Sequence, residues 1–435
     1  MLSREENERV TRVGADTPGG ELLRRYWHVV GAASEMENCW TKRVRLLGED
    51  LVLYKNRQGE LGLIEERCPH RGASLAYGIP TKDGIRCPYH GWQFDGQGGC
   101  IEQPNEPEGS KLKDKIKTPA YPVETLGGLV FAYLGPDPAP LLPRFDGFLA
   151  DDAIRMVGQA MIPCNWLQIM ENSLDPVHTE WLHGQFHEFI MEEEGAKFTI
   201  SRKHLKIAFD EFEYGMIKRR LLEGQSEDCD DWQVGHPVVF PNILSVGSGG
   251  GKGLWRSYAF QIRVPMDDTH TMHYWYNAYL PPDGTDVPER LLTEVPLYDV
   301  PYTDETGEYI VDMIDAQDIM AWVFQGEIAD RSRENLGSTD RGVASFRRML
   351  QREIKKVEQG EEPIGVIRDA AKNQRIDLPL EKDKEHFRDG FASLLARTQA
   401  RYSPIAVDLL DLFAPGDDKS DMRSLQYAGS LHARG

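Results

Sequence analysis

Two short segments of the chain combine cysteine and histidine in a spacing that suits metal binding. The first, CPHRGA, carries Cys68 and His70, and the second, CPYHGW, carries Cys87 and His90 after a spacer of sixteen residues. Thiolate sulfur and imidazole nitrogen are ligands for zinc and for iron centres. A glycine closes each segment and lets the backbone turn tightly around a bound group. The pattern therefore predicts a metal centre held by two matched loops.

Three interpretations fit these four residues: a tetrahedral zinc site, a chance coincidence, and a two-iron, two-sulfide cluster. The matching of the two loops argues against chance. A zinc site would explain neither the glycines nor the prolines, Pro69 and Pro88, that stiffen both loops. Cys-x-His, a spacer of this length and Cys-x-x-His together resemble the Rieske family. The resemblance implies a [2Fe–2S] cluster with the two cysteines on one iron and the two histidines on the other.

The ligand set also indicates the redox range and the branch of the family. Two imidazoles in place of two thiolates raise the reduction potential to between about −150 and +300 mV. Respiratory-chain Rieske proteins add a disulfide between the loops, but Ala73 and Tyr89 occupy those positions here. The loops therefore resemble the soluble oxygenase or ferredoxin type.

Basic residues lie near the two loops in the sequence. They form either a solvated face or a docking surface for an acidic electron donor. They are Arg67, Arg71, Lys82, Arg86 and the run KLKDKIK.

A second candidate site lies in NWLQIMENSLDPVHTEWLHG, which contains Asp175, His178 and His183. On a regular helix Asp175 and His178 share one side, whereas His183 lies about 140° further round. Both imidazoles reach one metal only if the helix breaks or bulges between them. Pro176 and Gly184 bracket the segment, and π-bulges favour functional sites.

The Rieske oxygenases carry such a motif after their Rieske loops and hold mononuclear iron(II) with two histidines and one carboxylate. The resemblance implies His178 and His183 as ligands. His187, four residues after His183, is the alternative partner. By the same resemblance Asp175 bridges His178 to His90 of a neighbouring subunit, which makes Asp175 a catalytic coupling residue. Such a bridge implies a closed ring, most often a trimer.

The third iron ligand is expected in IVDMIDAQDIMAWVFQGEIADRSREN, residues 310–335, which predicts one long helix with an apolar surface. Asp312, Asp315 and Asp318 recur every three residues, so helical period does not separate them. The phthalate-dioxygenase-like branch carries its ligand in a Gln-Asp pair ahead of Gln-Gly and Asp-Arg pairs. That resemblance implies Asp318, with Asp315 as the alternative.

The elements that position these residues are predicted to form two domains, because 435 residues exceed the usual size of one. We expect a helical lead-in over residues 1–40, a Rieske domain of short strands over 41–148 and a catalytic domain over 149–435. Runs such as WRSYAFQIRVP and MHYWYNAYLPP predict strands, and GVASFRRMLQREIKKVEQG predicts an amphipathic helix. The fold class is therefore α+β, with an all-β Rieske domain followed by an antiparallel sheet flanked by helices, helix-grip-like.

Charge and composition exclude other classes of function. A net charge of −20 argues against nucleic-acid and membrane partners. No run of eighteen apolar residues exists, and the charged start MLSREENERV lacks a secretory pattern, so we expect a cytoplasmic protein. Six cysteines in a chain of this size do not form a disulfide scaffold.

The resemblance to phthalate-dioxygenase-type α-subunits runs from TPGGELLRRYWHVV to DRSRENLGSTDRGVASFRRML. It implies a terminal oxygenase that uses O₂ and electrons from a ferredoxin or ferredoxin reductase supplied by NAD(P)H. PCNWLQIMENSLDPVHTEWLHG resembles the O-demethylases of lignin-derived biaryls such as 5,5′-dehydrodivanillate, so the expected reaction is O-demethylation of a methoxylated aromatic acid. The alternative is cis-dihydroxylation of a phthalate-like carboxylate. A different class, an electron carrier or regulatory subunit with an inactive second site, would hold two irons instead of three.

An aromatic acid requires a cation in its pocket. Arg219, Arg220 and Arg256 lie in the region expected to line that pocket. The competing interpretation is that they are solvent-facing residues on strand edges.

Overall fold

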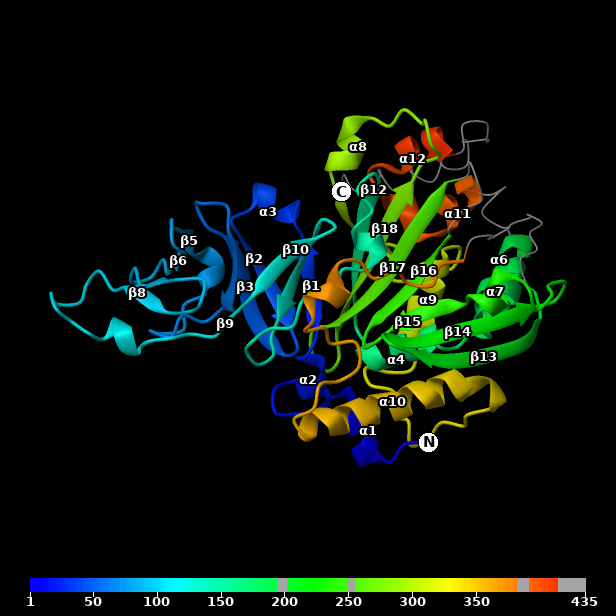
Figure 1. Cartoon of the computed structure of the whole chain (residues 1–435), viewed down its shortest axis with the longest axis horizontal. Helices are drawn as coiled ribbons and strands as arrows, with labels where there is room; N and C mark the ends of the chain where they lie inside the picture. Colours follow the sequence, from blue (N-terminus) through cyan, green and yellow to red (C-terminus); the bar gives the residue numbers. More distant parts are fainter. Residues whose placement is uncertain (194–201, 249–254, 382–390, 414–435) are drawn as a thin grey trace.

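Three small sheets form most of the amino-terminal part of the chain, and one large sheet with helices around it forms most of the rest (Figure 1). The computed structural model describes residues 1–193, 202–248, 255–381 and 391–413. Three small antiparallel sheets come first: β1 (Trp27–Ala32), β11 (Leu129–Tyr133) and β10 (Val123–Leu126); β2 (Thr41–Leu46), β3 (Glu49–Lys55), β4 (Leu61–Glu65) and β9 (Ala120–Tyr121); and β5 (Ile79–Pro80), β6 (Ile85–Arg86), β7 (Gln93–Phe94) and β8 (Cys100–Glu102).

One large sheet forms the centre of the second part. Its strands, in spatial order, are β13 (His204–Phe212), β14 (Gly215–Leu222), β15 (His236–Val239), β16 (Ile243–Ser248), β17 (Arg256–Pro265), β18 (Thr271–Leu280), β12 (Ile154–Ile162) and β19 (Leu297–Asp299). All neighbours are antiparallel except β12 and β19. The two runs predicted as strands are β17 and β18, paired from Arg256↔Leu280 to Pro265↔Thr271. The predicted α+β class is confirmed.

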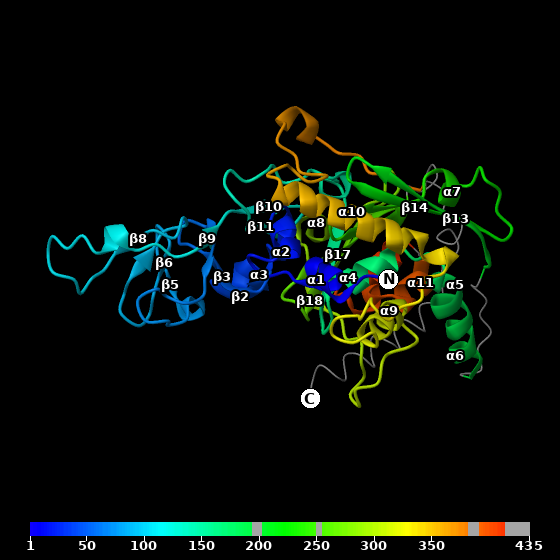
Figure 2. The same ribbon diagram turned by 90° about the horizontal axis from the view of Figure 1, so that it is seen from below.

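Most of the helices in the described residues pack around this sheet, whereas α3 (Glu35–Asn38) lies beside β1 in the amino-terminal part. The helices are α1 (Arg4–Thr11), α2 (Pro18–Leu23), α3, α4 (Trp166–Ser173), α5 (His178–Glu180), α6 (His187–Glu193), α7 (Asp230–Gln233), α8 (Glu289–Thr293), α9 (Ile314–Val323), α10 (Arg341–Glu358), α11 (Phe391–Arg397) and α12 (Ala406–Phe413). Short 3₁₀ turns lie at Leu75–Tyr77, Lys113–Lys115, Asp146–Phe148, Ser338–Asp340, Ala370–Asn373 and Gln399–Tyr402. Seen from below, α1 and α10 lie side by side (Figure 2). In the described part of the chain, no helix has the length and apolar character needed to cross a membrane.

Two predicted elements differ in extent from the structure. The helix expected over 310–335 is α9 alone, because Gly326 at φ 91° takes the left-handed conformation that ends a helix. The lead-in over 1–40 is not helical throughout, since β1 lies inside it and pairs with β11. Every residue of β1 is buried, so this segment packs as a strand of the amino-terminal part. The amphipathic helix predicted from GVASFRRMLQREIKKVEQG is confirmed as α10.

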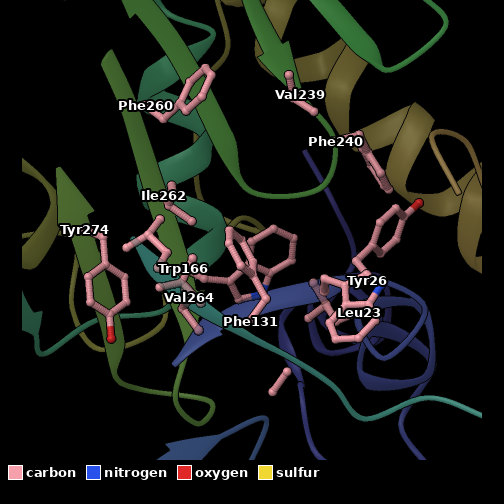
Figure 3. Packing of buried hydrophobic residues seen from close by; sticks show 14 of the residues in the cluster. Leu23, Tyr26, Phe131, Trp166, Val239, Phe240, Phe260, Ile262, Val264 and Tyr274 are labelled. Atoms are coloured by element: carbon pink, nitrogen blue, oxygen red, sulfur yellow. The ribbon is translucent and has the colours of Figure 1, made fainter. Parts of the chain in front are cut away.

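One hydrophobic core joins the two parts of the molecule (Figure 3). It contains Leu23 and Phe131 from the amino-terminal part, and Trp166, Phe260 and Ile262 from α4 and the large sheet. All five side chains are at most 4% exposed. The amino-terminal sheet that contains β11 is therefore packed against the large sheet of the second part. The two loop cysteines and residues of β6 and β7 belong to a separate hydrophobic cluster.

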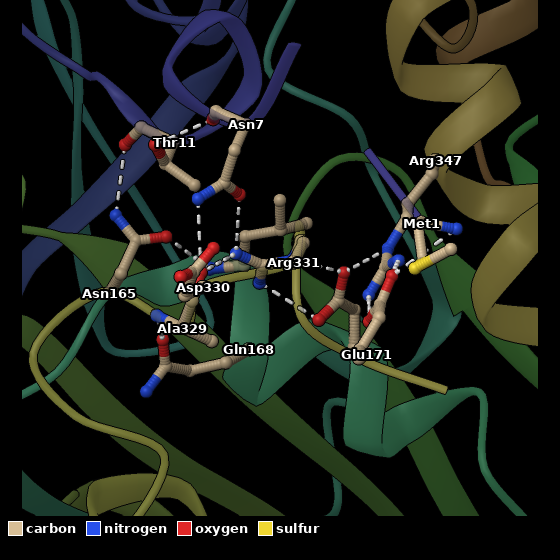
Figure 4. A network of polar contacts seen from close by, with 12 residues as sticks. Met1, Asn7, Thr11, Asn165, Gln168, Glu171, Ala329, Asp330, Arg331 and Arg347 are labelled. Carbon is tan, nitrogen blue, oxygen red and sulfur yellow. Dashed lines mark hydrogen bonds and ion pairs between the residues drawn. The ribbon is translucent and has the colours of Figure 1, made fainter. Parts of the chain in front are cut away.

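A buried ion network fixes α4, the helix that leads into the predicted iron motif (Figure 4). Both oxygens of Glu171 accept hydrogen bonds from Arg331, each at 2.8 Å, and Oε1 also accepts one from Arg347 at 2.6 Å. Glu171 is 8% exposed and Arg331 is 1% exposed. Burial alone would raise the pKa of Glu171, but the two guanidinium charges hold it below its ordinary value. The network ties α4 to α10 and to the segment after α9.

We expect Glu171→Ala to lower the free energy of unfolding by about 3 kcal/mol, because two guanidinium groups are left buried without a counter-charge. Urea unfolding at pH 7 measures this. Glu358→Ala, which removes a surface pair with Arg9, is the control and should cost less than about 1 kcal/mol. The pKa of Glu171 in the folded protein lies below the value of about 4.3 expected in the unfolded chain. The stabilisation that the Glu171 carboxylate provides is therefore complete above about pH 4.3, and it is lost as the pH falls through the pKa of the folded state. Equal effects of the two substitutions would contradict this role.

Candidate metal centres

The two Cys-His loops adopt the same backbone turn. The first connects β4 to β5, and the second connects β6 to β7. The amide of Gly72 donates to the carbonyl of Cys68 at 2.8 Å, and the amide of Gly91 donates to that of Cys87 at 3.1 Å. Both glycines are in the left-handed region, at φ 72° and 77°. A side chain at either position would strain the turn, which explains the glycine in each segment.

The four predicted cluster ligands converge in two pairs. Cys68 and Cys87 are 1% and 2% exposed, whereas His70 and His90 are partly exposed, with ring centroids 4.6 Å apart. Burial raises the pKa of the Cys68 thiol to about 11, so ionisation of this sulfur requires a bound cation. Among the described residues two groups have ligand atoms within 4.8 Å of one another, and the loop residues form neither. A single zinc ion would draw all four ligand atoms to about 4 Å, so the spacing fits a two-iron cluster.

The chain around His178 and His183 departs from a regular helix where the sequence required it. After the short helix α5, residues Trp181–Phe186 form a π-helical turn, and α6 then begins at His187. The wider turn brings the His183 ring to the side that carries His178, with ring centroids 5.2 Å apart. The bulge predicted between the two histidines is therefore present.

Asp318 on α9 completes the group. Its Oδ1 lies 3.2 Å from Nε2 of His183 and 3.7 Å from Nε2 of His178, and the three ligand atoms lie within 4.8 Å of one another. Burial lowers the pKa of His178 to about 3, which keeps the ring neutral and able to bind metal. Burial also opposes ionisation of Asp318, but the charge of His183 and its hydrogen bond to the carboxylate bring the pKa of Asp318 to about 2. Two imidazoles and one carboxylate on one side are the ligand set of a non-haem iron(II) site.

Gln317 orients one of these ligands and was not predicted from the sequence. Nδ1 of His183 donates to Oε1 of Gln317 at 2.9 Å, which leaves Nε2 for a metal. Nε2 of Gln317 in turn donates to the carbonyl of Val311 at 2.6 Å and lies 3.3 Å from Nδ1 of His187. His187 therefore lies behind the group instead of inside it. The feature of the sequence that could have identified Gln317 is its position directly before Asp318.

The other carboxylates of this segment have different partners. Asp315 is 6% exposed and accepts a hydrogen bond from the amide of Gln399 at 2.6 Å. Asp312 accepts from Arg401 at 2.9 Å. Of the three aspartates with equal spacing, the structure brings only Asp318 to the two histidines.

Asp175 lies beside His178 and reaches the surface. Its Oδ2 is 3.8 Å from Nδ1 of His178, too long for a hydrogen bond, and its Oδ1 accepts from the amide of Val177 at 2.9 Å. The side chain is 31% exposed. His90 of the same chain is not brought near: in Figures 1 and 2 the sheet β5–β8 lies at the far left and α9 on the right.

The structure does not bring the predicted substrate arginines to the metal group. Arg219 donates to Asp210 at 2.7 Å, Arg220 donates to Asp231 at 3.0 Å, and Arg256 is exposed. Lys218, directly before them, is only 6% exposed and was missed. Strand alternation places it on the face opposite to Arg219.

Two cavities lie in this part of the molecule. The first, of about 670 Å³, is lined by Asp175 and His178 and by acidic and basic residues of the segment after α9. The second, of about 140 Å³, lies between the sheet and α11 and is lined by Trp275, Asn277 and Asp315 among others. None of the three predicted iron ligands lines the second cavity; its connection to them is Asp315, which is one helical turn before Asp318 on α9.

Comparisons with known proteins agree with this arrangement. Three family models match in succession: Rieske [2Fe-2S] domain over residues 26–122, vanillate O-demethylase oxygenase C-terminal domain over residues 162–295, and LigXa C-terminal domain like over residues 301–378. The first model begins at residue 26, one residue before β1.

Curated relatives match over most of their length. The 5,5′-dehydrodivanillate O-demethylase oxygenase subunit of Sphingobium sp. is 43% identical over 87% of this chain and 87% of its own. The phthalate 4,5-dioxygenase oxygenase subunit of Pseudomonas putida is 32% identical over 84% and 89%. The tert-butanol monooxygenase / tert-amyl alcohol desaturase oxygenase subunit of Aquincola tertiaricarbonis is 45% identical over 79% and 76%.

Solved structures share the fold at low identity. The terminal oxygenase of carbazole 1,9a-dioxygenase from Nocardioides aromaticivorans is 19% identical with a TM-score of 0.58, covering 80% of this chain and 97% of that one. A carbazole 1,9a-dioxygenase oxygenase in complex with ferredoxin is 20% identical with a TM-score of 0.55, covering 80% and 94%. The chain therefore belongs to the Rieske non-haem iron oxygenases: it is an oxygenase subunit, of a family with a [2Fe–2S] cluster in the Rieske domain and mononuclear iron in the catalytic domain.

Proposed function

We propose that this oxygenase subunit O-demethylates a methoxylated aromatic acid. The observation that carries the proposal is the joint match to a demethylase catalytic domain and, at 43% identity, to a 5,5′-dehydrodivanillate O-demethylase subunit. The convergence of His178, His183 and Asp318 supports it, because it supplies an iron site of the required type. The iron, when bound, supplies the binding and activation of O₂ that hydroxylation of a methoxy group needs. The hydroxylated group then collapses to a phenol and formaldehyde.

The chain's own residues have defined roles in this proposal. The two cysteines and two histidines of the loops hold the [2Fe–2S] cluster. His178, His183 and Asp318 hold the mononuclear iron, and Gln317 fixes the His183 tautomer through its hydrogen bond at 2.9 Å. The second cavity, with its aromatic and amide lining, accommodates the substrate ring beside α9 and away from bulk water.

Asp175 joins two subunits in the proposal. Since it is 31% exposed and lines the cavity of about 670 Å³, a Rieske loop of a neighbouring subunit has room to approach it. That cavity is lined by five carboxylates and three arginines, so its lining is negative on balance, whereas Arg67 and Arg71 add positive charge beside the loops. This complementarity supports a closed ring, of which a trimer is the simplest form. A ferredoxin or ferredoxin reductase, supplied from NAD(P)H in the cytoplasm, is the proposed electron donor, in line with the ferredoxin complex among the similar structures.

The second candidate function is cis-dihydroxylation of a phthalate-like aromatic carboxylate. The 32% identity to a phthalate 4,5-dioxygenase subunit over 84% of the chain favours it. Both reactions use the same metal ligands, so the products distinguish them.

Formaldehyde release tests the proposal. The purified protein, reduced in advance, is mixed with O₂ and with 5,5′-dehydrodivanillate, vanillate, phthalate or tert-butanol. We expect about one formaldehyde per productive turnover from a methoxylated acid and no diol. A cis-diol from phthalate with no formaldehyde from any substrate would establish the second function instead. Product from tert-butanol alone would contradict both.

A further inference from the structure

Lys218 is a buried ammonium group without a dedicated counter-ion. It lies in β14 and is 6% exposed. Within the described part of the chain its ammonium makes no hydrogen bond and no ion pair, whereas the two arginines that follow it are both paired with aspartates. A buried lysine normally has a partner, because removing an ammonium from water costs several kcal/mol. Its position therefore calls for a ligand that carries negative charge.

The strand register places Lys218 on the sheet face that carries the second cavity. Lys218 lies opposite His236, and extending the Val238↔Leu244 register by two residues places Val246 in the same row. Val246 pairs with Ala259, and Ala259 pairs with Asn277. The last three of these residues line the cavity. Lys218 and Asn277 are four strand spacings apart, or about 19 Å between backbones at ~4.8 Å per spacing.

Other charged groups on this face are already engaged. Arg220 is paired with Asp231 at 3.0 Å, and His236 with Glu381 at 2.9 Å. Arg263 is fully buried and donates to the side-chain oxygen of Gln261 at 2.6 Å, although its Nε has no partner in the described structure. Of these four groups, Lys218 is the one whose side chain has neither a hydrogen bond nor an ion pair in the described structure.

Lys218 also lies within electrostatic range of the metal group. The negative charges of Asp175 and Asp318 favour its ammonium form, and its own positive charge disfavours protonation of His178. Neither aspartate is free to neutralise it, since Asp318 is the proposed iron ligand and Asp175 the proposed bridge between imidazoles. Burial lowers the pKa of Lys218 to about 8, so the ammonium form still dominates at pH 7.

The cavity at the far end of the row is lined by one carboxylate, Asp315. The described residues that line it include no lysine or arginine. Nδ2 of Asn277 is buried there without a hydrogen-bond partner in the described structure, so it is available to donate to a ligand oxygen. An aromatic ring fits this end of the row, and its carboxylate requires a cation elsewhere on the face.

We propose that Lys218 binds the carboxylate of the aromatic acid, while the cavity around Asn277 holds the ring that is distant from this carboxylate. This assignment rests on the proposed function, which it deepens by specifying an elongated, two-ring acid. The span of about 19 Å between the two backbones suits an acid that is longer than one ring. Lys218 is a specificity-determining residue in this scheme.

The test compares an acid with its neutral analogue. We measure dissociation constants of the iron-loaded protein, without reductant, for 5,5′-dehydrodivanillate and for its diamide, in the parent, Lys218→Met and Lys218→Arg. Lys218→Met should weaken binding of the acid about 10- to 100-fold and leave diamide binding within about twofold, since a hydrogen bond to a charged group is worth about 1.5–3 kcal/mol. Lys218→Arg should restore most of the affinity for the acid. Lys206→Met, which removes an exposed lysine of the same sheet, is the control and should change neither constant.

Two results would overturn the assignment. Acid binding that is unchanged in Lys218→Met excludes contact with the carboxylate, and equal weakening of acid and diamide shows a packing role instead. Iron content and urea midpoints of the variants show whether the fold is preserved; where Lys218→Met does not fold, Lys218→Arg and Lys218→Gln replace it in the same comparison. Absence of formaldehyde from the parent would refute O-demethylation, but the comparison of acid with diamide would still decide the role of Lys218.

Discussion

Replacing Asp175 with asparagine is expected to reduce turnover to below one hundredth of the parent value while all iron stays bound. The amide keeps the size of the carboxylate and preserves the hydrogen bond from Val177 to Oδ1. It places an NH₂ group, which only donates, where the second carboxylate oxygen would accept from an imidazole. Hydrogen-bond partners of metal-bound histidines typically contribute 10- to 100-fold, and loss of the proposed bridge between subunits adds to that effect. Steady-state product formation with the electron donor, beside iron and sulfide content, measures the change.

A matched aspartate controls for the loss of one negative charge. Asp210→Asn removes a surface carboxylate paired with Arg219 on the same sheet, and we expect turnover near the parent value. Parent-level turnover in Asp175→Asn with both centres loaded would show that Asp175 is not the coupling residue.

The second large effect is expected from Asp318→Ala, which should release the mononuclear iron and abolish product formation. Loss of one of three protein ligands leaves two imidazoles, whose ring centroids are 5.2 Å apart, without the anionic oxygen that neutralises part of the metal charge. Two irons per chain should remain, because the Rieske loops lie at the other end of the molecule. Iron analysis after gel filtration measures the difference.

Asp315→Asn is the control for this substitution. Asp315 is equally buried on α9, but it accepts from the amide of Gln399, so we expect three irons per chain and some loss of stability. If Asp315→Asn lost iron and Asp318→Ala retained it, the assignment of the third ligand would be wrong.

Features that depend on local spacing could be predicted from the sequence. The two Cys-His loops are of this kind, because each turn closes within a few residues around its glycine. The π-helical turn Trp181–Phe186 was predictable as well, since His178 and His183 meet on one side only if the helix widens. The choice of Asp318 over Asp315 came from the family pattern. The helical period could not separate them, because aspartates three residues apart lie on the same side of a helix.

Features that depend on tertiary contacts could not be predicted. The extent of α9 is set by Gly326, whose conformation is visible only in the folded chain. The run Lys218-Arg219-Arg220 looked like a set of equivalent cations, but strand register and distant aspartates give each residue a different environment. Gln317 acquires its role only when α9 packs beside the π-helical turn.

The most direct test of the account is Mössbauer spectroscopy of the protein loaded with ⁵⁷Fe and isolated in the oxidised-cluster state. The central claim is that one chain holds two kinds of iron centre, a cluster in the Rieske loops and a single iron at His178, His183 and Asp318. We expect three iron signals of equal area: two from the inequivalent ferric sites of the cluster and one from a high-spin ferrous site, which disappears in Asp318→Ala. A spectrum with only the two cluster signals in the parent protein, or a ferrous signal that survives in Asp318→Ala, would contradict the account.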